Sequence, residues 1–157
     1  MKVKLLAMGK TDEPWLKQGM MEYETRIRRY LPLEIVEIPG LKNLSHLGKP
    51  EWKAREAAKI LPNLTPADII ILLDEKGKEM TSVGFSSFLN RKFGSGSKNL
   101  VFVIGGPYGF DEAVKKEAHY SLSLSQMTFS HQMVRLFFLE QLYRALTILR
   151  NEAYHHE

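Results

Sequence analysis

The chain has 157 residues, 44% of them hydrophobic, so we expect residues 1–157 to form one domain with a substantial core and no appended RNA-binding module. It contains no cysteine, which excludes disulfides, thiolate zinc sites, iron–sulfur clusters and cysteine nucleophiles. The formal net charge of +4 favours a polyanionic partner without identifying one.

The first half of the chain alternates predicted strands and helices. Lys2–Met8 has the pattern of a strand, and Pro14 suits the first turn of a following helix. Apolar residues at helical spacing indicate that helix: Leu16, Met20, Tyr23, Ile27 and Leu31. A second strand is predicted over Leu33–Ile38. Pro39–Pro50 is rich in Gly, Asn, Ser and Pro, which is typical of a loop and makes it a candidate mobile or substrate-contacting segment. A helix follows to about Leu61.

The second half continues the alternation. The predicted elements are a strand over Asp68–Leu73, a helix over Thr81–Phe93 capped by Thr81 and stopped at Gly94, a GSGSK turn, a strand over Leu100–Ile104, a helix from an Asp111 cap to Ala118, a strand over Tyr120–Leu124, and a helix from His131 to about Arg150. Five strands interleaved with five helices predict an α/β fold, a mostly parallel sheet with helices on both faces.

The last predicted helix is apolar on almost every side. Its apolar residues are Met133, Val134, Leu136, Phe137, Phe138, Leu139, Leu142, Tyr143, Leu146, Ile148 and Leu149. A helix on the surface of a monomer would not tolerate that pattern, so it is buried either against a second subunit or at the centre of its own chain. Glu140, Arg144 and Thr147 share one stripe of this helix, and they either form an intrahelical ion pair or face a site.

Glycines mark a predicted ligand site. Gly105, Gly106 and Gly109 free the backbone just past the buried strand that ends at Ile104, where ligands bind in open α/β sheets.

Other ligand-binding motifs do not match the spacing of this chain. A phosphate-binding P-loop ending in Gly9–Thr11 would need glycine at the position of Lys4, and the GxGxxG motif of dinucleotide-binding proteins does not occur. No two histidines have the HxxxH spacing of a zinc site. No apolar run approaches the ~20 residues of a membrane span, and no secretory signal is present, so we expect a soluble, cytoplasmic protein without a metal.

Four segments carry a resemblance to a known family through their order and spacing. They are KVKLLAMGK, LLDEKGKEMTS, VFVIGGPYG, and the stretch from SLSLSQMTFSHQMVR through EQLYRALTILRNEAYHHE. Over nearly its whole length the chain resembles the ribosomal RNA large subunit methyltransferase H family, the smallest SPOUT methyltransferases. The resemblance implies a C-terminal trefoil knot and a homodimer in which each cofactor pocket is completed at the interface. Ser130 departs from the proline usual in the family, and His156 stands where the family often has a basic residue.

The resemblance also implies S-adenosylmethionine as the cofactor. The positions that match the family's cofactor-binding segments are Leu73, Gly105, Leu124, Ser125, Gln126, Met127, Thr128 and Phe129. The sulfonium of this cofactor is already activated, so the enzyme has to align donor and acceptor and remove a proton, without a metal. Taken alone, the glycines are equally consistent with tight turns, and Leu124 and Met127 with ordinary core residues.

The implied acceptor is N3 of a pseudouridine, position 1915 of 23S ribosomal RNA, on the assembled ribosome. Glu140, Arg144, Tyr154 and His155 match positions that recur in the family and are the candidate catalytic residues. Arg144 would stabilise the developing anion or bind phosphate, His155 would accept a proton or hydrogen-bond the base, and Tyr154 would stack on it. Two alternatives stay open: a non-catalytic, basic ribosome-binding factor, and a SPOUT methyltransferase acting on transfer RNA.

Overall fold

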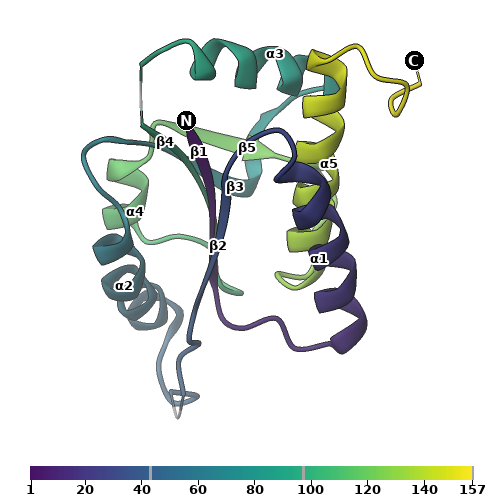
Figure 1. The fold of residues 1–157 in the computed structure, drawn as a ribbon. Helices are drawn as coiled ribbons and strands as arrows, with labels where there is room; N and C mark the ends of the chain where they lie inside the picture. The colour runs from purple at the N-terminus through teal and green to yellow at the C-terminus, as the bar shows by residue number, and fades with distance from the viewer. Residues whose placement is uncertain (43, 97, 157) are drawn as a thin grey trace.

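Strands and helices alternate along the chain in the computed structural model, which describes residues 1–42, 44–96 and 98–156 (Figure 1). In those residues the elements are β1 (Lys2–Met8), α1 (Pro14–Ile27), β2 (Leu33–Ile38), α2 (Lys49–Ile60) with a 3₁₀ turn (Leu61–Asn63), β3 (Asp68–Glu79), α3 (Ser82–Phe93), β4 (Asn99–Ile104), α4 (Glu112–Glu117), β5 (Tyr120–Ser123) and α5 (Met133–Leu149). The predicted alternation of strands and helices is confirmed.

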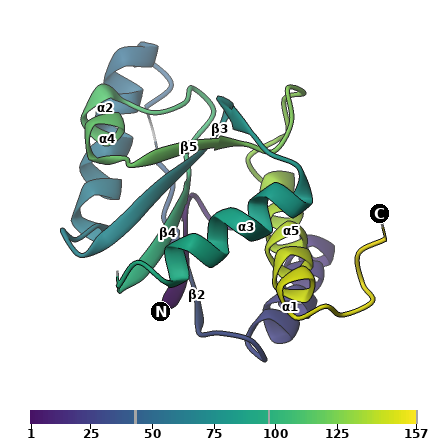
Figure 2. The same ribbon diagram turned by 90° about the horizontal axis from the view of Figure 1, so that it is seen from above.

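The strands form one sheet in the order β2-β1-β4-β3-β5, and each pair of neighbours within the described residues is parallel. Side chains alternate between its faces: Leu5 and Phe102 point to one, Leu6 and Val103 to the other. Helices α1, α3 and α5 cover the first face, and α2 and α4 cover the second (Figures 1 and 2). The predicted parallel sheet with helices on both faces is therefore confirmed.

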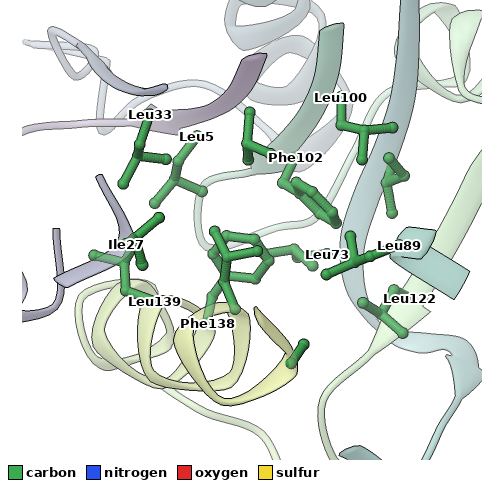
Figure 3. Close-up of a cluster of buried hydrophobic side chains, with 14 of the residues drawn as sticks. Leu5, Ile27, Leu33, Leu73, Leu89, Leu100, Phe102, Leu122, Phe138 and Leu139 are labelled. Carbon is green, nitrogen blue, oxygen red and sulfur yellow. The ribbon is translucent and has the colours of Figure 1, made fainter. Parts of the chain in front are cut away.

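The larger part of the core lies beneath α5. The rings of Phe102 and Phe138 are 4.6 Å apart between centroids, and Leu139 lies beside Phe138 against the sheet (Figure 3). The sheet-facing side of α5 is thus buried within its own chain, whereas Phe137 on another side is 41% exposed. Burial inside one chain accounts for only part of the apolar surface of this helix.

Strand β3 is longer than predicted. The sequence indicated an end at Leu73, but the strand continues to Glu79 after a shift in its register with β5 between Leu73 and Lys78. Its charged second half does not have the pattern of a strand, and pairing with β5 overrides that local preference. The close approach requires glycine at position 77, because a Cβ there would lie 2.6 Å from the carbonyl carbon of Ser121.

Helix ends agree with the sequence where a side-chain cap marks them. Thr81 accepts a hydrogen bond from the Gly84 N–H at 3.0 Å, and Asp111 caps α4, as predicted. The extension of α1 to Leu31 was wrong, because the helix ends at Ile27 and a turn follows. Helix α5 begins two residues after the predicted His131.

The predicted loop and turn fall partly on undescribed positions. The described residues between Ile38 and Lys49 form neither helix nor strand, while Lys49 and Pro50 already belong to α2. Asn43 in this loop and Ser97 in the predicted turn lie outside the described residues.

Candidate functional site

A cavity of about 360 Å³ lies at the carboxyl ends of β4 and β5, beside the point in the middle of β3 where its apolar half ends. The chain leaves β3 toward α3 on one face of the sheet and leaves the neighbouring β4 toward α4 on the other face. The two connections diverge, and such a divergence opens a crevice at the strand ends. The cavity is at the edge that the glycines after Ile104 predicted.

Seven of the eight residues predicted to bind cofactor line this cavity. They are Leu73, Gly105, Leu124, Ser125, Met127, Thr128 and Phe129. Gln126 is not part of the lining, and its side chain is exposed. The parallel sheet brings three segments that are distant in sequence to the same edge. Their cofactor role stays a prediction.

The segment after β5 is held by a hydrogen bond within itself and by another to β3. Ser125 Oγ accepts the Met127 N–H at 3.0 Å, and the Thr128 hydroxyl donates to a carboxylate oxygen of Glu75. Ser130 Oγ accepts the N–H of Met133, the first residue of α5, at 3.0 Å. This hydrogen bond ties the segment to the start of the helix.

Sequence reasoning missed three contributors to the cavity wall. Asp74 and Glu75 line it and place two carboxylates at the end of the apolar half of β3. Phe110 lies under Gly105, where its ring comes within 3.0 Å of the position that a Cβ would take. Carboxylates that follow a buried strand directly were the available signal for the first two, whereas only the folded loop reveals Phe110.

His131 lines the cavity beside a fully buried arginine. Arg135 donates from Nε to the His131 carbonyl at 3.0 Å and from its terminal nitrogens to the carbonyls of Met8 and Gly9, each at 2.9 Å. It also pairs with Glu37 at 3.0 Å, which compensates its buried charge. Burial, and secondly the charge of Arg135, lower the pKa of His131, so this imidazole is neutral at pH 7.

The four candidate catalytic residues form one cluster on α5 and the residues after it. Arg144 donates to Glu140 Oε1 from both Nε, at 3.1 Å, and Nη2. Tyr154 donates to the same oxygen at 3.0 Å, and the Arg144 guanidinium lies over the Tyr154 ring, 4.7 Å from its centroid. Arg144 Nη1 is 3.2 Å from His155 Nδ1. Glu140 and Arg144 therefore form the intrahelical ion pair that their spacing allowed.

The contacts in this cluster assign its donors and acceptors. A guanidinium can only donate, so His155 Nδ1 accepts this hydrogen bond and Nε2 is the ring nitrogen that carries hydrogen. Burial, and secondly hydrogen bonds to Tyr23 and Glu140, raise the pKa of Tyr154, which keeps its hydroxyl protonated at neutral pH. The Tyr154 hydroxyl is a hydrogen-bond donor to Glu140 in this arrangement, and the catalytic roles of Tyr154 and His155 stay predictions.

Within one chain the cluster and the cavity are separate. The lining of the first cavity includes no member of the cluster, although Glu140 lines an adjoining cavity of about 250 Å³ that shares Leu122, Leu124 and Phe129 with it. Figure 1 shows the last residues beyond the end of α5 that is farthest from the carboxyl edge of the sheet.

None of the helices in the described part of the chain is long and apolar enough to cross a membrane. Across residues 1–42, 44–96 and 98–156, no group of three or more His, Asp or Glu side chains is arranged to hold a metal ion.

Comparisons with known proteins decide the family. Residues 1–155 match the family model described as a predicted SPOUT methyltransferase. The chain is 52% identical to the ribosomal RNA large subunit methyltransferase H of Parabacteroides distasonis and 53% identical to that of Flavobacterium johnsoniae, each over the full length of both proteins. The chain belongs to the ribosomal RNA large subunit methyltransferase H family of SPOUT methyltransferases. The resemblance seen in the sequence is confirmed, and the protein is a methyltransferase.

A solved structure supports the fold. The chain resembles a probable methylase family protein from Haemophilus influenzae with a TM-score of 0.52 at 10% identity, over 99% of this chain and 70% of the other. Because so few residues are identical, this likeness concerns the fold alone.

Proposed function

We propose that the protein transfers a methyl group from S-adenosylmethionine to N3 of pseudouridine 1915 in 23S ribosomal RNA on the assembled ribosome. The observation that carries this proposal is the cavity at the carboxyl edge of the sheet, which gathers seven of the eight residues expected to hold the cofactor. The names of the full-length relatives support a ribosomal RNA acceptor. Such a substrate would also place the enzyme in the cytoplasm.

The cavity suits this cofactor in size and chemistry. Its volume of about 360 Å³ lies within the range of small-molecule sites. Leu73 and Leu124 supply apolar walls, and Gly105 exposes backbone groups that can hydrogen-bond an adenosyl moiety. The carboxylates of Asp74 and Glu75 favour a sulfonium cation, while His131 adds no positive charge because it is neutral. When bound, the cofactor supplies an activated methyl group.

A homodimer would bring the cluster to the cavity. Glu140, Arg144, Tyr154 and His155 lie outside the first cavity of their own chain, and the exposed Phe137 shows that α5 has apolar surface left to bury. We propose that a second copy packs against α5, so that the cluster of one subunit faces the cavity of the other. We also propose that the segment from β5 to α5 forms the trefoil knot.

The cluster would promote loss of the N3 proton by charge. The guanidinium of Arg144 stabilises the anion that forms as the proton leaves to solvent. Glu140 holds that guanidinium by two hydrogen bonds, and Tyr154 holds Glu140 in turn. The Nε2–H of His155 is available to a carbonyl oxygen of the base.

The first test is transfer of labelled methyl from S-adenosylmethionine to intact ribosomes, free 23S RNA and transfer RNA, with the product nucleoside identified. We expect label in N3-methylpseudouridine with ribosomes only. Label in transfer RNA would overturn the proposed acceptor. Cofactor binding without transfer to any RNA, or no binding at all, would favour a non-catalytic ribosome-binding factor.

A further inference from the structure

Helix α2 contributes a buried carboxyl group behind the cavity wall. Glu56 is 5% exposed, and it is not among the cavity-lining residues. Its Oε1 and the indole nitrogen of Trp52 are both buried without a hydrogen-bond partner of good geometry among the described residues. Burial of an incompletely paired carboxyl group lowers stability, so its presence here calls for a function.

The carboxyl group lies directly against the glycine loop that follows β4. A Cβ on Gly106 would lie 2.0 Å from Glu56 Oε2 and 2.7 Å from Glu56 Cδ, so position 106 accommodates only glycine while Glu56 is in place. Burial raises the pKa of Glu56, and the nearby Trp52 side chain and the Gly106 backbone lower it by a smaller amount. Gly106 itself lines the cavity, so Glu56 contacts the outer side of the wall.

The same helix contacts the loop at a second point. The rings of Trp52 and Tyr108 meet edge to face, 5.7 Å apart between centroids, and the ammonium group of Lys49 lies 5.6 Å from the centre of the Tyr108 ring. Tyr108 is 44% exposed, so its position depends largely on these contacts. Helix α2 therefore holds the loop at Gly106 from behind and at Tyr108 from the side.

We propose that Glu56 is a positioning residue for cofactor binding, which holds the Gly105–Gly109 loop in the shape that forms the cavity wall. This inference rests on the proposed function, because it assumes that the cavity binds S-adenosylmethionine. Glu56 acts through Gly106 and does not contact the cofactor. Its loss leaves space behind the loop, and the wall then occupies several shapes of which only one binds well.

The test is the affinity for S-adenosylmethionine, measured by calorimetry, together with KM and kcat for the cofactor. For Glu56→Ala we expect an affinity about tenfold lower and a kcat at saturation within about twofold of the wild-type value, since a lost buried contact of this kind is worth about one decade. Glu56→Gln keeps the shape and one acceptor oxygen, so it restores wild-type affinity. Glu51→Gln, on the exposed side of the same helix, is the matched control and leaves the affinity unchanged.

A double variant separates positioning from general stability. Gly106→Ala alone forces its new Cβ against Glu56 and weakens binding by more than Glu56→Ala does. In Gly106→Ala/Glu56→Ala the methyl group enters the vacated space, so binding is no weaker than in Glu56→Ala alone. If Glu56→Ala does not fold, Gly106→Ala and Glu56→Gln still carry the test.

These measurements separate a failure of the proposed Glu56 role from a failure of the proposed cofactor binding. Wild-type protein that does not bind S-adenosylmethionine overturns both. Wild-type protein that binds, with Glu56→Ala binding equally well, overturns only the role of Glu56. Additive losses in the double variant, or a melting temperature that falls while affinity at low temperature is unchanged, assign Glu56 to general stability.

Discussion

The cavity and the C-terminal cluster differ in how they are built and in the groups they present. The cavity is lined by residues in the middle of β3 and by the segments after β4 and β5, which present glycine backbone, apolar side chains and two carboxylates. The cluster is built from one helix and the residues after it, and it consists almost entirely of charged and hydrogen-bonding side chains. The first suits a small, mostly apolar ligand, and the second suits an acceptor that develops negative charge.

The separation of the two regions has a consequence for assembly. Each is complete in its local contacts, yet Arg144 is not in the lining of the cavity of its own chain. If both serve one reaction, a second copy has to bring them together. Variants in one region should therefore change cofactor affinity, and variants in the other should change turnover.

The largest expected effect is on turnover. Arg144→Ala should lower kcat by about a hundredfold or more, because a positioned cation at a developing anion has an effect of that order. Binding of S-adenosylmethionine, measured by calorimetry, should stay within about twofold of wild type. Arg91→Ala, at an exposed arginine in the last turn of α3, is the matched control. An Arg144→Ala enzyme with normal turnover would remove Arg144 from the mechanism.

The next effect is a recovery of activity on mixing. Gly105→Val should inactivate the cavity, because a side chain there meets the Phe110 ring. Unfolded together in equal amounts with Arg144→Ala and refolded, the two inactive variants should regain about a quarter of wild-type activity, since half of random dimers are mixed and each has one intact site. Mixtures that stay inactive, although native mass spectrometry shows mixed dimers, would mean that each chain uses its own cluster.

A smaller effect is expected on affinity alone. Gly105→Ala places a Cβ 3.0 Å from Phe110 and should weaken cofactor binding about tenfold, with kcat at saturation little changed. Gly40→Ala is the control, because its Cβ would have only an ordinary contact of 3.8 Å with Gly9. An equal loss in kcat and affinity would contradict the expectation that cavity variants change cofactor affinity and leave turnover unchanged.

Tyr154→Phe should have a still smaller effect on turnover. It removes one hydrogen bond to Glu140 and keeps the ring under Arg144, so a loss of about fivefold in kcat is expected. Steady-state kinetics on ribosomes would measure this. A loss as large as that of Arg144→Ala would instead indicate that the hydroxyl touches the acceptor.

The smallest expected effect is on the pKa of Tyr30, whose hydroxyl donates a hydrogen bond to Glu152 near the C-terminus. Burial, and secondly the Glu152 carboxylate that accepts its hydrogen bond, raise the pKa of Tyr30 from 10.0 to about 12. The folded state binds this proton more tightly than the unfolded state, so the stabilisation is present below about pH 10 and is lost as the pH rises toward 12. A tyrosinate absorbance titration should show a late component that Tyr30→Phe removes.

Local signals explain what could be predicted from the sequence. The apolar run before Leu73 and the run before Ile104 each predicted a buried strand, and the glycines after the second run placed the cavity at the correct edge. The helix caps at Thr81 and Asp111 were predicted because a cap depends on residues within one turn. Helical spacing allowed the ion pair of Glu140 and Arg144 as one of two alternatives, and the structure has it.

Long-range contacts explain what could not. The second half of β3 is a strand only because β5 lies beside it, and the sequence of that half favours a loop. Helix α5 is apolar nearly all round, but only the packed structure shows which side its own sheet buries and that Phe137 stays exposed.

The sequence by itself therefore determined the order of the strands and helices along the chain, the family, and the edge of the sheet where a ligand would bind. These depend on periodicity, on caps and on the backbone freedom of glycine, all of which act over a few residues. Only the tertiary structure decided that Asp74 and Glu75 line the cavity, that Glu56 stands behind Gly106, and that the cluster lies apart from the cavity in its own chain. Those facts depend on distances between residues far apart in sequence, which no local pattern encodes.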